Sequence, residues 1–233
     1  MDLVVLGGCF QKGANSTRIA WGRAEVWRVC RREWRQPLST NEPEQTPPVP
    51  AEVYVSFMSE VNTTTMEGLL GVVAHHVNAG VKTIHLLLST PGGQVNCGIS
   101  AYNVLKALPV ELVTWNTGTV DSIGNVIYLS GARRYAAKNS RFMFHGVSMS
   151  LGAEVSLPEK DLRELMSAVQ SDNALISGII AERTNVDAQK LDSLFLEASF
   201  LSAQDAKAFD IVHEVRDVEV PPGAPVLQLT FQR

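Results

Sequence analysis

Strand-like and helix-like segments alternate along the chain from Ala51 onward, and this alternation limits the possible folds more than any other feature. Two segments are continuous apolar runs, "VKTIHLLLS" (81–89) and "VELVTW" (110–115), which is typical of strands buried on both faces. A helical stretch over residues 95–108 separates them and ends at Pro109. Because strands that alternate with helices form parallel sheets, we predict an α/β fold.

The same patterns predict the other elements. Period-two alternation indicates a strand at "EVYVSF", and helical spacing indicates a helix after "NTTTMEG". A long helix with one apolar stripe is predicted over residues 157–183. Ser202 opens a last short helix with "SAQD", a variant of the capping box. We further expect a helix at "IGNVIYLSG" and strands at "RRYAA", "RFMFHGV" and "DIVHEV".

Both ends of the chain differ from its middle. Residues 1–50 are rich in Arg and Trp and then in Pro, Thr and Glu, without a sustained period, so we predict an irregular, flexible N-terminal extension. Residues 51–216 form the predicted domain, and residues 217–233 a C-terminal tail.

Composition excludes several classes of protein. The chain has 233 residues, 45% of them hydrophobic, which suits one domain of ordinary size. A formal net charge of −4 argues against nucleic acid as a partner. Its 3 cysteines form no C-x-x-C pair, so we expect neither a disulfide framework nor a metal site. No apolar run reaches the ~20 residues of a membrane span, and we expect a soluble, cytoplasmic protein without membrane contact.

The loop "STPGGQ" follows a predicted buried strand. Its two glycines allow backbone geometry that side chains would forbid, and they expose N–H groups that bind a phosphate or the oxyanion of acyl transfer. No G-x-x-x-x-G-K-[ST] motif is present, which excludes a P-loop. Taken alone, Pro-Gly-Gly favours a plain tight turn.

Ser122 stands in "TGTVDSIGN", between a predicted strand and a predicted helix. At a helix N-terminus, the dipole and the free N–H groups stabilise negative charge, which suits a nucleophile. The same place also suits an N-cap serine. Since Val120 stands where the G-x-S-x-G nucleophile elbow has glycine, the local pattern alone favours the cap.

His145 ends the predicted strand "RFMFHGV". A neutral imidazole within hydrogen-bond reach of Ser122 would serve as a general base. A histidine at a strand end is more often structural, and His75, His76, His85 and His213 look equally available.

The conjunction of these segments resembles a known family. A Pro-Gly-Gly loop, a G-x-x-x-S-x-G serine turn and an Asn-Ser-Arg-x-Met-x-His strand occur in this order in the ClpP family, the proteolytic subunits of ATP-dependent Clp proteases within the ClpP/crotonase superfamily. Here Thr90 replaces the first serine of that loop motif. A weaker similarity runs from about residue 51 to about 215, and "SFLSAQDAKAFDIVHEV" resembles the family's closing helix and strand.

The resemblance implies a fold, an activity and partners. The fold would be ClpP/crotonase-like, with repeated β-β-α and β-α units and a long oligomerisation helix. Ser122 would be the nucleophile and His145 its base, and the N–H groups of Gly93 and Ile123 would form the oxyanion hole. Unfolded polypeptides would be hydrolysed through an acyl-enzyme, in a homo-oligomeric ring with an AAA+ unfoldase. No metal or small cofactor is implied, since the unfoldase would use the ATP.

The sequence departs from the family at three places. Ala198 occupies the position of the triad aspartate, although Glu197 or Asp192 could supply a substitute carboxylate to orient His145. Asp121 precedes the serine, where the family usually has alanine, and would either crowd the site with charge or point into solvent. "GVSMSLGAEVSLPEK" replaces the family's Gly-rich strand, which puts ring stacking in doubt.

Two other functions stay open. Ala198 favours a catalytically reduced subunit that builds or regulates a mixed ring. A crotonase-type acyl-CoA enzyme shares the sheet and the paired N–H groups, but that chemistry needs no serine nucleophile, so the pairing of Ser122 with His145 counts against it.

Overall fold

The structure is a computed structural model that describes residues 49–149, 156–196 and 198–231. The predicted N-terminal extension lies outside the described residues except for Val49 and Pro50. Glu197, the predicted substitute carboxylate, also lies outside them. The predicted domain is described apart from residues 150–155 and 197, and most of the predicted C-terminal tail is described as well.

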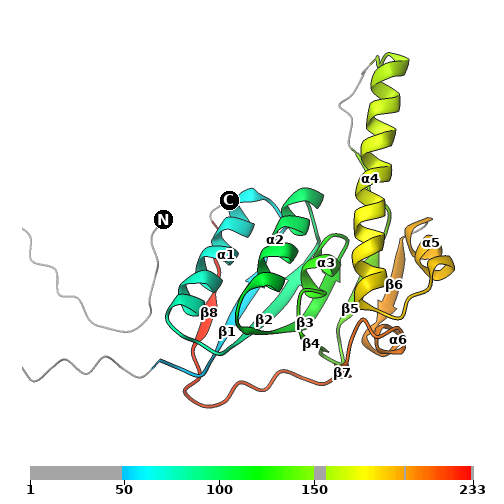
Figure 1. Ribbon diagram of the computed structural model, residues 1–233. Coiled ribbons are helices and arrows are strands. Elements are labelled where there is room, and N and C mark those ends of the chain that lie inside the picture. The colour runs from blue at the N-terminus through cyan, green and yellow to red at the C-terminus, as the bar shows by residue number, and fades with distance from the viewer. Residues whose placement is uncertain (1–48, 150–155, 197, 232–233) are drawn as a thin grey trace, which may run out of the picture. The chain divides into compact units, whose positions relative to one another are not determined.

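Strands and helices alternate through the first half of the described chain, which confirms the α/β prediction. In the second half, short strands and helices follow in mixed order (Figure 1). The strands are β1 (Glu52–Met58), β2 (Thr83–Thr90), β3 (Glu111–Asp121), β4 (Arg133–Ala136), β5 (Arg141–Phe144), β6 (Ser199–Ser202), β7 (Glu214–Val215) and β8 (Val226–Gln228). The helices are α1 (Thr63–Asn78), α2 (Val95–Ala107), α3 (Gly124–Tyr128), α4 (Glu159–Arg183), α5 (Ala188–Leu196) and α6 (Ala203–Ala208).

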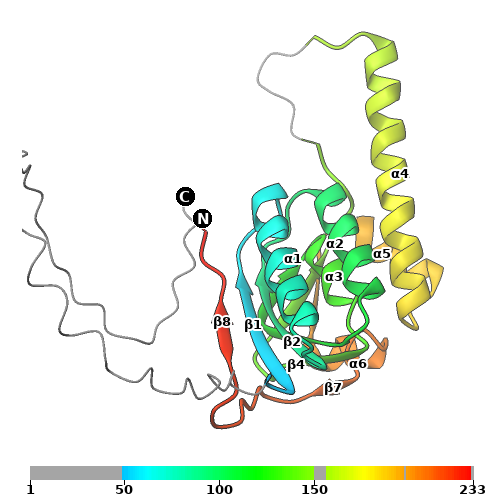
Figure 2. The ribbon, with the colours of Figure 1, turned by 60° about the vertical axis from the view of Figure 1, so that its left-hand side comes forward.

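One mixed sheet organises these elements. Its main order is β6-β5-β3-β2-β1-β8, and β4 pairs with β3 and with β7. All of these pairs are parallel except β5 with β6, which is antiparallel. Helices α1, α2 and α3 lie side by side on one face of the sheet (Figures 1 and 2). The carboxyl ends of β2, β3 and β5 therefore meet at one edge, where open α/β sheets place their sites.

The core lies between the sheet and these helices. The apolar runs of β2 and β3 are buried as predicted, with Ile84, Leu86 and Leu88 fully shielded from solvent. Each such side chain contributes about 1.5–3 kcal/mol relative to an exposed one. This packed core holds the carboxyl ends of the strands in fixed positions.

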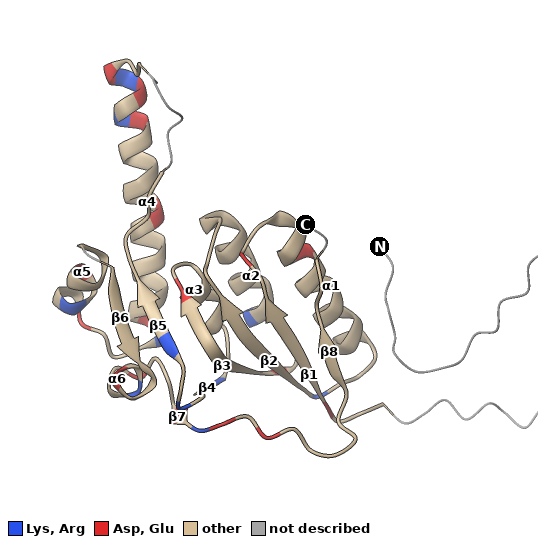
Figure 3. Cartoon of the chain, turned by 180° about the vertical axis from the view of Figure 1, so that it is seen from behind, with Lys and Arg blue, Asp and Glu red and all other residues tan. Residues whose placement is uncertain are grey.

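Helix α4 confirms the predicted long helix, but its apolar stripe is only partly covered. Ile176 and Ile180 are buried, whereas Leu162, Met166 and Leu175 are 46%, 62% and 52% exposed. The first half of α4 extends beyond the sheet (Figures 1 and 2), and charged side chains gather at its beginning (Figure 3). Among the described helices, none has both the length and the apolar character that a bilayer crossing requires.

Strand β8 comes from the segment predicted as a C-terminal tail. It pairs in parallel with β1, and Leu229 N donates a hydrogen bond to Ser56 O at 3.1 Å. The Phe231 ring meets Phe57 edge to face, with centroids 6.1 Å apart. A Cβ added to Gly68 would lie 2.8 Å from the Phe231 ring, so this glycine makes room for it. The sequence patterns predicted no element here, nor at α5.

Candidate active site

Ser122 lies at a sharp turn between β3, which ends at Asp121, and α3, which begins at Gly124. Its φ of 56° falls in the left-handed region, which few residues other than glycine occupy. Such a conformation costs of the order of 1–3 kcal/mol and persists only where surrounding contacts impose it. The strain points to a specific task for this serine.

Ser122 does not cap the helix. The N-cap of α3 is Ile123, and no side chain caps this helix. Among the described residues, no hydrogen bond involves the hydroxyl oxygen of Ser122. The capping interpretation, which the local pattern alone favours, is therefore wrong.

The serine turn is bonded to the strand that leads to His145. Ser122 N donates to Met143 O at 2.8 Å. The Asn125 side chain adds two bonds, because its Nδ2 donates to Ser122 O at 3.0 Å and to Met143 O at 2.8 Å. Met143 stands two residues before His145, so these three bonds fix the serine relative to the histidine.

The Pro-Gly-Gly turn packs directly against the serine turn. A Cβ added to Gly92 would lie 2.7 Å from the Cβ of Ser122, and one added to Gly93 would lie 2.2 Å from Val61 O. Both glycines have positive φ, 87° and 148°. A side chain at either position would therefore force this turn away from Ser122.

Two backbone N–H groups that line the cavity of Ser122 have no partner among the described residues. The neighbouring Gln94 N donates to Val61 O at 2.7 Å, and Gly92 N donates to Thr90 Oγ1 at 3.1 Å. Within the described part of the chain, no hydrogen bond uses the N–H of Gly93 or of Ile123. These are the two groups that the sequence predicted for the oxyanion hole.

A small cavity joins the four predicted residues. Ser122, His145, Gly93 and Ile123 all line one cavity of about 60 Å³. The apolar wall comes mainly from α2, β5, α4 and α5, through Val95, Phe144, Val147, Ile176, Ile180 and Phe195. The carboxyl ends of β2, β3 and β5 bring these groups together, as the strand order requires.

His145 is held through its Nδ1 atom, which lies 2.6 Å from Gly146 O. A carbonyl oxygen only accepts hydrogen bonds, so Nδ1 carries the proton and Nε2 is free to accept one. This is the tautomer that a general base needs. No hydrogen bond joins Ser122 to His145 among the described residues, and such bonds are often long before substrate binds.

The comparisons with known proteins agree with this geometry. The sequence model of the Clp protease family matches residues 49–219, well over half of the chain. The chain belongs to the Clp protease family. A solved structure of a ClpP1 mutant from Listeria monocytogenes resembles it in fold, with a TM-score of 0.61 and 21% identity over 72% of this chain and 92% of that chain. The match to the family ends before β8.

Ala198, which the family resemblance places at the position of the triad carboxylate, is exposed and immediately precedes β6. The antiparallel ladder of β5 and β6 ends at the pair Phe144 and Ser199, so His145 and Ala198 are the next residues beyond this end of the ladder. Asp192, the other predicted substitute, is exposed on α5. No ion pair or hydrogen bond joins it to His145 in the described part of the chain.

Asp121 neither crowds the cavity nor points into solvent. Its side chain is buried, and its Oδ1 accepts a hydrogen bond from Thr119 Oγ1 at 2.6 Å. It is not among the described residues that line the cavity of Ser122 and His145. Of the segment that departs from the family's Gly-rich strand, residues 150–155 lie outside the described residues.

His85 has a structural environment. Trp115 Nε1 donates to its Nδ1 at 3.1 Å, its Nε2 lies 3.2 Å from a Glu52 carboxylate oxygen, and its ring stacks on Tyr54. Burial lowers the pKa of His85, while its hydrogen bond to Glu52 opposes that shift. Among the described residues, no group of three His, Cys, Asp or Glu side chains could hold a metal ion.

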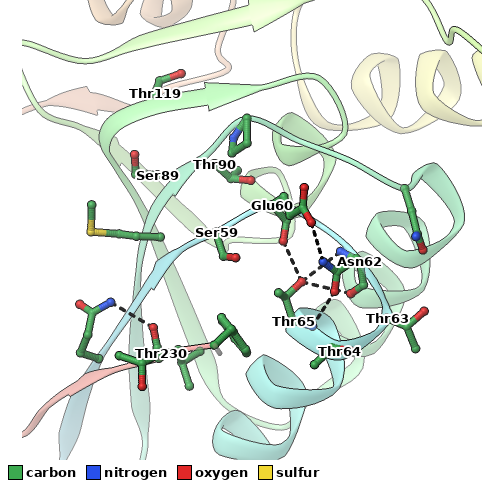
Figure 4. Close-up of a pocket in the computed structure, with 16 residues that line it drawn as sticks. Ser59, Glu60, Asn62, Thr63, Thr64, Thr65, Ser89, Thr90, Thr119 and Thr230 are labelled. Atoms are coloured by element: carbon green, nitrogen blue, oxygen red, sulfur yellow. Dashed lines mark hydrogen bonds between the residues drawn. The ribbon is translucent and has the colours of Figure 1, made fainter. Parts of the chain in front are cut away.

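A larger hollow of about 1250 Å³ lies beyond the Pro-Gly-Gly turn (Figure 4). Pro91 and Thr90 line it, but Ser122 and His145 do not. Some of its hydroxyl groups already form hydrogen bonds within the lining. Thr65, which belongs to the capping box of α1, donates from its Oγ1 to Glu60 O at 2.7 Å. Its lining residues include no histidine that could pair with a serine, so the smaller cavity is the candidate active site.

Sequence reasoning missed two asparagines of the site. Asn125 lies in the predicted helix after Ser122, where an asparagine on a buried face is a visible but unspecific signal. Asn173 lies in α4, and its Oδ1 accepts a hydrogen bond from Val147 N at 2.9 Å. Nothing in the local sequence marks Asn173, because its partner lies 26 residues away.

Proposed function

We propose that this chain is a serine peptidase that hydrolyses peptide bonds of unfolded polypeptides through an acyl-enzyme on Ser122. The observation that carries the proposal is the strained Ser122, which shares one cavity with His145, whose Nδ1 lies against Gly146 O, and with two N–H groups that have no partner among the described residues. Membership of the Clp protease family supports the same reaction class.

The reaction follows from the roles of these groups. As the hydroxyl of Ser122 attacks the scissile carbonyl, Nε2 of His145 takes its proton. The N–H groups of Gly93 and Ile123 stabilise the oxyanion, a contribution of about 10²–10³ in rate for each donor in other enzymes. His145 then protonates the leaving amine, and water hydrolyses the acyl-enzyme by the same steps. This sequence uses neither a metal nor a small cofactor.

The alanine at position 198 sets the expected rate of acylation. A neutral carbonyl stabilises the imidazolium formed during acylation less than a carboxylate does. Neutralising the triad carboxylate elsewhere costs about 10⁴ in rate, so we expect slow acylation. Ala198 accordingly supports a second function, a catalytically reduced subunit of a mixed ring. The third candidate, a crotonase-type acyl-CoA enzyme, has less support because its chemistry gives the strained Ser122 no role.

Assembly belongs to the proposal. The exposed side chains Leu162 and Met166, four residues apart on one face of α4, form an apolar surface that a single chain leaves uncovered. Another copy of the chain would cover such a surface in a homo-oligomeric ring. An AAA+ unfoldase would deliver the unfolded substrate and use the ATP. A cytoplasmic location, without nucleic acid or membrane contact, stays a prediction.

A fluorophosphonate that acylates activated serines tests the proposal. We expect an adduct on Ser122, located by mass spectrometry, in the assembled wild-type protein. His145→Ala should abolish it, whereas Ser100→Ala, a change of an exposed serine on α2, should leave it intact. An assembled wild-type protein without this adduct would contradict the peptidase and favour the catalytically reduced subunit.

A further inference from the structure

The peptide unit between Gly146 and Val147 is bonded at both of its ends. Its carbonyl oxygen lies 2.6 Å from Nδ1 of His145, and its N–H donates to Oδ1 of Asn173 at 2.9 Å. Because a trans peptide unit is planar, its C=O and N–H point in opposite directions. A group that fixes the N–H therefore also fixes the direction of the carbonyl.

The preceding peptide unit is held as well. Gly146 N donates to Phe195 O in α5 at 3.1 Å. A Cβ added to Gly146 would lie 3.1 Å from the same oxygen, so only glycine lets the two backbones approach without a shift. Asn173 stands one turn before Ile176, which is buried and lines the cavity. The support for the His145 loop is thus anchored in two packed helices.

This support matters because, among the described residues, no carboxylate is hydrogen-bonded to His145. Which ring nitrogen of a neutral histidine carries the proton depends on the hydrogen bond that the other nitrogen makes. Ala198, the residue next beyond this end of the β5–β6 ladder, offers no acceptor through its side chain. Among the described residues, the polar partner of the imidazole is Gly146 O.

We propose that Asn173 is a positioning residue for the base. It holds the 146–147 peptide so that the Gly146 carbonyl, in place of a triad carboxylate, keeps the proton of His145 on Nδ1. This inference rests on the proposed function, since it assigns His145 the role of general base. The carbonyl supplies the tautomer and the orientation but no negative charge, so Asn173 improves the geometry of the site without restoring its electrostatics.

The test compares three variants by two readouts. Asn173→Ala removes the acceptor, Asn173→Asp keeps an oxygen that accepts from Val147 N, and Gln170→Ala changes an exposed amide on the same helix as a control. Nitrogen NMR of labelled histidine, recorded at about pH 8, reports the tautomer of His145. The rate at which a fluorophosphonate labels Ser122, measured between about pH 5.5 and pH 9, reports how well His145 acts as the general base.

We expect Asn173→Ala to move the proton of His145 partly to Nε2 and to slow the labelling about tenfold, the scale of one lost hydrogen bond. Asn173→Asp and Gln170→Ala should keep the wild-type tautomer and rate. Asn173→Leu, which fills a similar volume without an acceptor, makes the same test if Asn173→Ala does not fold.

An unchanged tautomer and an unchanged labelling rate in both acceptor-free variants would overturn the positioning role. The proposed function fails separately, through a wild-type protein that shows no adduct on Ser122. The NMR readout needs no activity, so it decides the role of Asn173 in that case as well.

Discussion

The N–H of Ser122 donates a hydrogen bond to the carbonyl of Met143 at 2.8 Å, two residues before His145. One backbone bond thus sets the distance between the candidate nucleophile and its base. The Asn125 side chain reinforces it by bonding to the carbonyls of both Ser122 and Met143. The site is therefore built mainly from main-chain groups, which local packing positions firmly.

Asn125→Ala should loosen this connection. Asn125 is 1% exposed, and the variant leaves the buried carbonyls of Ser122 and Met143 each one donor short. Loss of a buried partner costs about 1–3 kcal/mol, which urea unfolding would measure. Asn103→Ala, a change of an exposed asparagine on α2, is the matched control. Equal stability and equal Ser122 labelling in the two variants would contradict the bridging role.

Gly93→Ala should disable the oxyanion hole. The added Cβ would meet Val61 O at 2.2 Å, so the turn must shift and we expect its N–H to lose its alignment with the oxyanion. We expect Ser122 labelling to slow by about 10²–10³, as for a lost oxyanion donor. Gly80→Ala is the control, because Gly80 also has a positive φ, of 94°, but open space around it. That control should lose ~1 kcal/mol of stability and no labelling.

Ala198→Asp should accelerate the acylation of Ser122. Ala198 and His145 each lie one residue beyond the same end of the β5–β6 ladder, so we expect the new carboxylate to reach the imidazole and to stabilise its charged form. The gain approaches about 10⁴ if the geometry of a complete triad is reached. Ala198→Asn adds a side chain of the same shape without the charge, and it should gain far less. Equal labelling rates in Ala198→Asp and Ala198→Asn would refute this interpretation of the site.

Stability should fall in mild acid because of His85. Its folded-state pKa is lowered, mainly by burial, so the unfolded chain binds a proton more readily. The contribution is complete above the unfolded pKa of about 6.5 and is lost as the pH falls toward the folded value. Protonation also breaks the bond from Trp115 Nε1.

Urea unfolding between about pH 8 and pH 5 measures this slope, since each unfolded chain takes up protons that the folded chain excludes. His85→Gln should flatten it. Some slope should remain, because burial also lowers the pKa of His76 and of His213. An identical slope in the variant would exclude His85 as the main cause.

The sequence predicted the site residues that lie at the ends of strands. Gly93, Ser122 and His145 each follow a predicted strand, and in a mostly parallel sheet such ends meet at one edge. The apolar runs of β2 and β3 were readable because both faces of these strands are buried. The fold and the central four residues of the site were therefore accessible from pattern and family resemblance together.

Contacts between residues that are distant in the sequence could not be predicted from it. The bond from Val147 to Asn173 and the bonds from Asn125 to two carbonyls involve side chains without a local pattern. The orientation of the Gly146 carbonyl likewise depends on tertiary packing. Strand β8 was missed because its 3 residues are too short for a visible alternation and its pairing to β1 is remote in sequence. Helix α5, with 9 residues, gave a similarly short signal.

Hydrolysis of an unstructured polypeptide tests the central claim most directly. The assembled wild-type protein, Ser122→Ala and His145→Ala would be incubated with a permanently unfolded substrate, and newly formed amino termini would be counted. We expect slow release of peptides by the wild type and none by either variant. Release that persists in Ser122→Ala, or an assembled wild type that releases nothing, would contradict the claim.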